Sequence, residues 1–439
     1  MNILILDPEK SVSHRISKDT SGGYGTGNDF GDTAVPTFLK KTLKKIHDWP
    51  PMFALYSMAV LKKFNHVVDY HKKLPENYND YDLFIIVSSI VCCETECDLI
   101  KKLSLLKKTI LVIGPFASNL PKKYCDAGGT VIVGEPEFFF LKNKSLELID
   151  QKNQITFDHN YSLDDLPYPE WEVVIKDNKT SLLFGTDKSL PILATRGCPY
   201  SCFKYCVYPL QQGRKPRQRE PKLIVDELEY WKKKFNVKMF IFRDPVFSIN
   251  RKHTLDFCKE LINRKLNIKF VIETHLRILD GELIKILKKA GLKAVKVGVE
   301  SYDEDVLKAS GRFSVSKDQQ LAKIRELETN EIQVSAMYIL GFPSDTKETI
   351  NKTINYAKKL NTTYAQFSVW TPYPGTPVFN EYKDKITAKK YDEFDQYHLV
   401  YEHGLFNKKN IRNYLSKAYS SYYLRVNWFF KYFMSFIKS

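Results

Sequence analysis

The sequence of 439 residues lacks any run of about 18 uncharged apolar residues, the length that a helix needs to span a bilayer. It also lacks a basic leader, because the start Met-Asn-Ile-Leu-Ile-Leu carries no basic side chain and Asp7 and Pro8 interrupt its apolar run. We therefore expect no transmembrane segment and no signal peptide. The chain is predicted to be cytoplasmic, with its first residues in a buried strand.

Acidic residues are fewer than basic ones, with 51 Asp and Glu against 67 Lys and Arg, and the formal net charge is +16. Such an excess can indicate nucleic acid, an acidic membrane or a phosphorylated substrate. The lysines are scattered, however, and mix with glutamate in helical patterns such as residues 227–234, which is typical of a solvated helix face. The charge does not favour nucleic-acid binding. An apolar content of 43% excludes wholesale disorder, and the length predicts two or three domains.

Cysteine is scarce, with eight residues, yet Cys198, Cys202 and Cys206 lie within nine positions. Thiolates this close, in a loop that contains glycine and has no partner cysteines at zinc-site spacing, suit an iron-sulfur centre. Four cysteines normally ligate a 4Fe-4S cluster, but the next one, Cys258, follows 52 residues later in a helical pattern. One iron would then stay open to a substrate or cofactor. The alternative is that the three cysteines are structural.

Cys92, Cys93 and Cys97 could be mistaken for a second site. They follow the strand pattern of residues 82–89, so we assign them to a turn and a helix start, packed in the core.

The first 150 residues alternate between strand and helix patterns. Strands are predicted at residues 2–6, 66–69, 82–89, 109–113 and 131–133, and helices at 54–63 and 96–106. Short apolar strands separated by helices indicate a doubly wound, Rossmann-like parallel sheet, whose ligands bind beyond the carboxyl ends of the strands. The glycine-rich segment 20–42 is expected to be a lid over the site or a plain flexible loop.

Six further strands are predicted at residues 191–195, 237–242, 269–273, 294–299, 333–340 and 364–370, separated by helical patterns. Six successive strand-helix units would curl into a partial (β/α)6 TIM-like barrel, with its chemistry at the carboxyl ends of the strands. The cysteine loop follows the first of these strands. The predicted domains are an α/β Rossmann-like domain at 1–155, a linker at 156–185, the barrel at 186–380 and a helical tail at 381–439.

The cysteine loop, the aromatic Tyr205 before its last cysteine and the ordered polar residues at the barrel strand ends resemble the radical S-adenosylmethionine (SAM) enzymes. One feature departs from the family pattern: three residues, instead of two, separate Cys202 from Cys206. The resemblance implies a 4Fe-4S cluster on Cys198, Cys202 and Cys206, with SAM on the open iron. The cofactor-binding residues that it implies are Tyr205, Asp244, Arg277, Glu300, Ser301 and Gly341. For Asp244, a loop-capping role is an equal alternative, and Arg277 could form a surface ion pair.

The N-terminal half resembles the cobalamin-binding domain that precedes the barrel in one radical SAM subgroup, through Pro50-Pro51-Met52 and Gly134-Glu135-Pro136-Glu137. The histidine motif that ligates cobalt in some cobalamin proteins is missing. Cobalamin would therefore be held without a protein ligand to cobalt, or would be absent. The residues implied for cobalamin are Ser88, Ser89, Gly114, Gly134 and Glu135.

The resemblance implies cleavage of SAM to a 5′-deoxyadenosyl radical and cobalamin-dependent methylation of an unactivated carbon, with a flavodoxin or ferredoxin as electron donor. Two alternatives stay open: radical rearrangement or cyclisation without methyl transfer, and a non-enzymatic iron-sulfur redox protein. A zinc module fails for want of a fourth ligand close by. No catalytic residue that acts on the substrate can be named.

The expected substrate is a small molecule or of lipid or glycan type. Four basic side chains between residues 214 and 219 could bind an anionic substrate or anchor their own loop. The aromatic helix predicted at 422–438 is expected to pack on the barrel, with peripheral contact to a membrane as the alternative.

Overall fold

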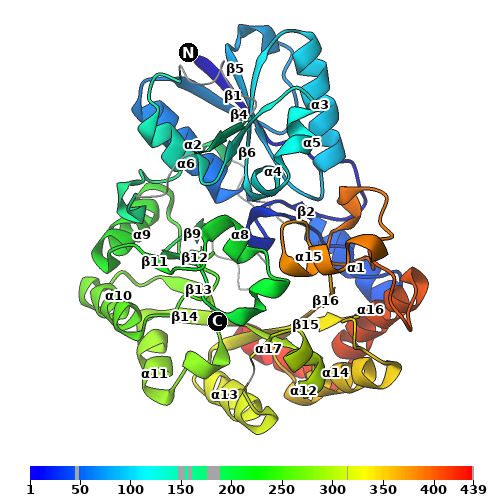
Figure 1. The fold of residues 1–439 in the computed structure, drawn as a ribbon. Coiled ribbons are helices and arrows are strands. Elements are labelled where there is room, and N and C mark those ends of the chain that lie inside the picture. The colour runs from blue at the N-terminus through cyan, green and yellow to red at the C-terminus, as the bar shows by residue number, and fades with distance from the viewer. Residues whose placement is uncertain (45–48, 147–153, 157–160, 176–187, 314, 438–439) are drawn as a thin grey trace.

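A computed structural model describes residues 1–44, 49–146, 154–156, 161–175, 188–313 and 315–437 (Figure 1). Two six-stranded sheets dominate this part of the chain, and Figure 1 shows the N-terminal sheet stacked end-on above the barrel. Much of the linker predicted at 156–185, and residue 186 where the barrel was predicted to begin, lie outside the described residues.

The N-terminal sheet is parallel throughout, with the strand order β4-β1-β5-β6-β7-β8. Its strands are β1 (Asn2–Leu6), β4 (Val67–His71), β5 (Leu83–Val87), β6 (Thr109–Ile113), β7 (Thr130–Val133) and β8 (Gln154–Thr156). Helices α2 (Met52–Lys63) and α6 (Pro136–Lys142) lie on one side, and α3 (Cys93–Leu105), α4 (Pro115–Asn119) and α5 (Pro121–Cys125) on the other (Figure 1). Because the chain runs outward in both directions from β1 and β5, this is the doubly wound topology that was predicted; β8 was missed.

Cys92, Cys93 and Cys97 are buried at the start of α3 among apolar side chains. Their predicted role in core packing is confirmed.

The glycine-rich segment is packed rather than open. It contains the short hairpin β2 (Ile16–Ser17) and β3 (Thr26–Gly27) and leads into α1 (Ala34–Lys44). Tyr24 is fully buried, and its hydroxyl donates a hydrogen bond of 3.0 Å to the carbonyl of Pro374 beyond the last barrel strand. The expectation of a plain flexible loop is wrong, because this segment fills the space between the two sheets.

The second sheet is an open barrel of six parallel strands in the order β16-β15-β14-β13-β12-β9. The strands are β9 (Ser189–Ile192), β12 (Met239–Phe242), β13 (Lys269–Glu273), β14 (Leu292–Glu300), β15 (Gln333–Leu340) and β16 (Tyr364–Val369). Helices α9 (Pro221–Phe235), α10 (Arg251–Arg264), α11 (Gly281–Ala290), α12 (Glu304–Ala309), α13 (Lys317–Thr329) and α14 (Lys347–Leu360) separate them. Within the described chain β9 and β16 do not pair, as expected for a partial barrel.

The first barrel strand is shorter than the predicted strand 191–195. The strand ends at Ile192. A separate two-residue strand, β10 (Thr195–Arg196), follows and pairs in antiparallel fashion with β11 (Arg217–Gln218). This hairpin, with α8 (Tyr208–Gln212) inside it, carries the cysteine loop.

The chain ends in α15 (Pro377–Glu381), α16 (Lys408–Tyr423) and α17 (Val426–Ile437). Helix α16 packs against β16 and α1, which joins the two ends of the chain (Figure 1). Among the described helices, none has the length and apolar character required to cross a membrane.

Candidate active site

The cysteine loop is closed by its own backbone. The amide of Cys198 donates to the carbonyl of Gly213 at 3.1 Å, and the amide of Cys206 donates to the carbonyl of Cys202 at 3.0 Å. Gly197 has a φ of +94°, and a side chain there would lie 2.3 Å from the carbonyl oxygen of Lys215, so only glycine fits. The three thiols are therefore held on one short loop beyond the carboxyl end of β9.

The donor set suits an iron-sulfur cluster better than a single ion. Across the described residues, no three His, Cys, Asp or Glu side chains converge on one ion position. A cluster does not require this convergence, because each thiolate binds a different iron. The hydrogen bond with Cys206, assisted by nearby Arg312, lowers the pKa of Cys202 to about 6, which favours the thiolate form that iron binds.

Arg312 joins the cysteine loop to the end of β14 and was not predicted from the sequence. Its Nη1 lies 3.7 Å from the Sγ of Cys202, while Nη2 donates to the carbonyl of Gly298 at 3.1 Å and lies 3.3 Å from Oε1 of Glu300. The sequence offers only a weak indication of Arg312, namely a Gly-Arg pair that follows Glu300 after one short helix. Arg312 thus links one predicted cluster ligand to a predicted cofactor residue.

Glu300 has a strained backbone. Its φ is +64°, in the left-handed region that non-glycine residues rarely adopt, and the pairing of β14 with β15 shifts register between Gly298 and Glu300. Gly298 is required beside it, since a side chain there would lie 2.4 Å from Oε1 of Glu300. Burial raises the pKa of Glu300 to about 7, opposed by Arg312. Strain and a perturbed carboxyl at one strand end are typical of a functional position.

Asp244 is placed as a loop cap. It is fully buried, and its Oδ1 accepts hydrogen bonds from the amides of Ala194 (3.0 Å) and Thr195, at the corner between β9 and β10. Its Oδ2 is buried without a hydrogen bond in the described structure. The geometry favours the capping alternative over direct contact with a cofactor.

Tyr205 of the cysteine loop lies close to the turn after β15 that contains Gly341. The ring of Tyr205 packs edge-on against Phe342, with 6.1 Å between centroids. Gly341 has a φ of +76°, and its carbonyl accepts a hydrogen bond from Tyr401. The position that a side chain of Gly341 would take is bordered by Ile411 of α16. On this side of Gly341 the structure leaves no room for the adenine that was predicted to approach it.

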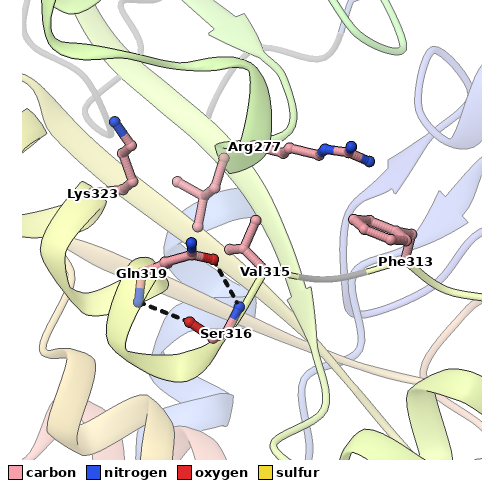
Figure 2. Close-up of a pocket in the computed structure, with 7 residues that line it drawn as sticks. Arg277, Phe313, Val315, Ser316, Gln319 and Lys323 are labelled. Carbon is pink, nitrogen blue, oxygen red and sulfur yellow. Dashed lines mark hydrogen bonds between the residues drawn. The ribbon is translucent and has the colours of Figure 1, made fainter.

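Ser301 and Arg277 make their contacts with α14 and with the segment before α13. The hydroxyl of Ser301 lies 3.2 Å from that of Thr353 on α14 and accepts the amide of Asp303, which does not support its predicted cofactor contact. Figure 2 shows Arg277 extending towards Phe313, 4.5 Å from its guanidinium carbon to the ring centroid. Arg277 lines a cavity of about 300 Å³ beside the start of α13. It does not form the predicted surface ion pair within the described residues.

The five residues predicted for cobalamin all follow β5, β6 or β7 at the carboxyl edge of the N-terminal sheet. Ser88 accepts the amide of Ala117 at 3.2 Å, and Ser89 donates to the buried carboxylate of Glu96 at 2.8 Å. Gly114 and Gly134 adopt φ values of +120° and +109°, and Glu135 is ion-paired. The side chains of Ser89 and Glu135 are thus engaged within the protein, and the hydroxyl of Ser118 donates to the carbonyl of Gly114 and accepts from the amide of Gly134.

A buried ion cluster links the two halves of the site. Arg196, just before the cysteine loop, contacts Oε1 of Glu135 and Oε1 of Glu137, both at 2.5 Å. Arg217 binds Glu135 from β11 at 2.8 Å. Burial opposes ionisation, yet the two arginines lower the pKa of Glu135, while burial raises the pKa of Glu137. The Gly-Glu-Pro-Glu motif therefore anchors the cysteine hairpin to the N-terminal sheet.

A small cavity of about 40 Å³ lies between the halves. It is lined from the N-terminal side by Gly22, Met52 and Phe53, and from the barrel side by Arg196, Arg243 and Tyr208 among others. The Pro50-Pro51-Met52 motif therefore faces the barrel mouth.

The barrel interior carries two ionisable groups that the sequence analysis missed. Lys296 and Glu273 are register partners on β14 and β13, so they share the face of Ala294 and Val271, which belong to the apolar cluster inside the barrel. Neither side chain forms a hydrogen bond or ion pair with the described residues. Their alternation with apolar neighbours resembles a solvated strand face, which explains why they were overlooked.

Replacing Lys296 with methionine is expected to stabilise the fold. Burial and nearby Arg243 lower the pKa of Lys296 to about 8, with Arg15 acting in the same direction and Glu273 and Asp19 opposing. In the unfolded chain Lys296 has its ordinary pKa of 10.5, so it binds its proton more tightly there than in the folded protein. The free energy of unfolding therefore rises with pH between about 8 and 10.5, and the destabilisation by the buried charge is fully present at pH 7. At pH 7 we expect Lys296→Met to raise the thermal midpoint by about 2 °C or more.

The measurement is thermal unfolding at pH 7 and pH 10, where the gain should shrink. A lower midpoint at pH 7 would mean that Lys296 serves the fold as a partner of Glu273. If removal of this polar side chain stabilises the protein, Lys296 is retained for function and not for stability.

Residues 192–357 match the family model of the radical SAM superfamily. An uncharacterized methyltransferase of Pyrococcus horikoshii is 27% identical over 456 aligned residues, covering 96% of this chain and 92% of that protein. The bacteriochlorophyllide d C-8(2)-methyltransferase of Chlorobaculum tepidum is 28% identical over 375 residues, covering 80% of each chain.

Two solved structures share the architecture. The cobalamin-dependent SAM radical enzyme OxsB superposes with a TM-score of 0.63 at 14% identity, covering 95% of this chain and 66% of that one. The radical SAM methyltransferase TsrM of Kitasatospora setae gives a TM-score of 0.58 at 16% identity, covering 87% and 76%. At these identities the likeness establishes the fold, and the predicted α/β class is confirmed. The family match identifies residues 192–357 as a radical SAM domain.

Proposed function

We propose that the protein methylates an unactivated carbon of a small molecule, using a 4Fe-4S cluster, SAM and cobalamin. The single observation that carries the proposal is the placement of the cysteine loop. It lies at the carboxyl ends of the barrel strands and is tied by Arg196 to the carboxyl edge of the N-terminal sheet. Both edges are the places where such sheets bind ligands.

Cys198, Cys202 and Cys206 would hold the cluster, leaving one iron for SAM. Bound there, the cluster and SAM supply the 5′-deoxyadenosyl radical that removes a hydrogen atom from the substrate. Arg312 would keep the thiolate of Cys202 and the carboxylate of Glu300 in fixed relation, and Glu300 would orient SAM. The barrel interior excludes water behind the reacting atoms through Met239, Ile241, Val271 and Ala294.

Cobalamin would lie against the carboxyl edge of the N-terminal sheet, facing the barrel mouth, where a bound methylcobalamin supplies the methyl group. Ser89 and Glu135 are engaged elsewhere, so we assign the close approach of cobalamin to the turns at Gly114 and Gly134, which carry no side chain, and its apolar contacts to Met52 and Phe53 beside the cavity. The names of the relatives from Pyrococcus horikoshii and Chlorobaculum tepidum support methyl transfer, and the cobalamin bound in OxsB supports the presence of cobalamin.

A second candidate is radical cyclisation without methyl transfer. The anaerobic magnesium-protoporphyrin IX monomethyl ester cyclase of Cereibacter sphaeroides is 32% identical over 231 residues, covering 52% of this chain. Binding of cobalamin by the purified protein does not distinguish the two candidates. Transfer of a labelled methyl group from SAM to the product distinguishes them, because only the methylation candidate predicts it.

We assign Lys296 and Glu273 to the substrate side of the barrel, because they face inward without partners from the described chain. An acid or amide group on a small molecule would satisfy both. A flavodoxin or ferredoxin would deliver the electron, and the cytoplasm would keep the eight free thiols reduced.

Glu300→Gln is expected to weaken SAM binding about tenfold or more, because a hydrogen bond to a charged group contributes about 1.5–3 kcal/mol. Iron content should not change. The measurement is anaerobic titration of the reconstituted protein with SAM, beside iron analysis. The matched control is Glu304→Gln, whose carboxylate pairs with Lys317 at the surface and should leave both values unchanged. Loss of iron from Glu300→Gln would assign Glu300, through Arg312, to the support of the cysteine loop.

A further inference from the structure

Helix α17 exposes large apolar side chains to solvent. Val426, Phe429, Phe430 and Phe433 are between 55% and 80% exposed, and Leu424 just before the helix is 63% exposed. Single exposed apolar residues are common on protein surfaces, but five within ten positions form a patch that indicates an interaction site. We call these five residues the α17 patch.

The helix is held with this patch facing outward. On its inner side, the indole nitrogen of Trp428 donates to the carbonyl of Thr363 at 2.9 Å, and Lys431 pairs with Glu328 at 2.5 Å. Arg425 donates to the carbonyl of Lys358 at 2.6 Å. Rotation to bury the phenylalanines would break all three contacts. The inner face thus packs through Trp428 and Tyr432 as well as these polar contacts, and a second apolar face, the α17 patch, is left in solvent.

The net positive charge of the C-terminal segment from residue 403 onward favours an anionic partner for the patch. After Glu402 the sequence has no Asp or Glu, while seven basic residues follow: Lys408, Lys409, Arg412, Lys417, Arg425, Lys431 and Lys438. Some pair with acids elsewhere, but Lys409, Lys417 and Arg425 have no ion pair with the described residues. A second copy of the chain would bring like charges together across the interface, whereas an anionic lipid surface would neutralise them.

We propose that α17 docks on the surface of a bilayer that contains anionic lipids, with the α17 patch among the acyl chains. The helix has 12 residues and lies in the interface instead of spanning it. Helix α17 contacts Thr363, the residue just before β16, through Trp428. The helix therefore lies at the amino ends of the barrel strands, opposite the cysteine loop. Docking leaves the mouth of the site facing away from the lipid. The helix therefore fixes the enzyme to a membrane without feeding a lipid substrate into the site.

The test uses the full chain, sedimented with vesicles of phosphatidylcholine alone and of phosphatidylcholine with phosphatidylglycerol. We expect binding to the anionic vesicles that weakens as salt rises. The triple variant Phe429→Ser, Phe430→Ser, Phe433→Ser should bind at least about tenfold more weakly. The matched control is Phe38→Ser, an equally exposed phenylalanine on α1, which should bind as the parent does.

Circular dichroism establishes that each variant is folded. The proposal fails if the parent chain binds neither vesicle, or if the triple variant binds like the parent. It also fails if the parent forms a dimer that the triple variant does not, with no lipid binding, because the partner is then a second copy. SAM cleavage by the triple variant should equal that of the parent, so this result stands apart from the proposed reaction.

Discussion

Cys202→Ala is expected to reduce cluster content and SAM cleavage to background. In the proposed site the cluster would have three thiolate ligands on one loop, and Cys202, the middle one, also contacts Arg312. With two ligands left, the cluster has no thiolate for a second iron and is lost to chelation or oxidation. The measurements are iron and acid-labile sulfide per chain and the release of 5′-deoxyadenosine after anaerobic reconstitution. Cys198→Ala and Cys206→Ala should behave in the same way.

The matched control is Cys258→Ala. This thiol is fully buried within α10, so the substitution removes a similar volume from the core without touching the loop. It should cost a small amount of stability and leave the iron content unchanged. Full iron and full cleavage in Cys202→Ala would show that the three-ligand assignment is wrong.

Arg196→Met is expected to lower the free energy of unfolding by about 3–5 kcal/mol, because it leaves two buried carboxylates without their shared partner. Glu135 keeps Arg217, whereas Glu137 loses its only ion-pair partner among the described residues. The cysteine hairpin would also lose its attachment to the N-terminal sheet. We therefore expect a lower midpoint in urea and a lower yield of reconstituted cluster.

A double variant separates the two effects. In Arg196→Met combined with Glu137→Leu, no unpaired charge remains at Glu137, so about half or more of the stability should return. Arg264→Met serves as the control, since Arg264 pairs with Asp226, Glu229 and Glu260 at the surface of the helical layer. Its loss should cost about 1 kcal/mol or less. Equal losses in the Arg196 and Arg264 variants would contradict a special role for the buried cluster.

The strands were predictable wherever burial alone decides the pattern. Strands 269–273 and 333–340 are observed as predicted, because apolar alternation ends abruptly at turn residues on both sides. Strand 191–195 was predicted as one element but breaks at Ile192. The cause is distant in sequence: the carboxylate of Asp244 takes the amides of Ala194 and Thr195, which a strand would need for pairing.

The candidate site was predictable only where chemistry is encoded locally. Three cysteines in nine positions are visible in any reading of the chain, and the strained position of Glu300 coincides with the end of a predicted strand. Arg312, Lys296 and Glu273 could not be found, since a single basic or acidic residue in a sequence resembles a solvated surface position. Their importance follows from tertiary contacts and from the inward face of the barrel, which only the fold defines.

The most direct test of the central claim is the release of 5′-deoxyadenosine from SAM by the anaerobically reconstituted protein, with and without a strong reductant and with added methylcobalamin. We expect release that requires the reductant, despite the three residues between Cys202 and Cys206, and no release from Cys202→Ala. The absence of release from protein that holds a full cluster would contradict the radical reaction and favour a redox protein.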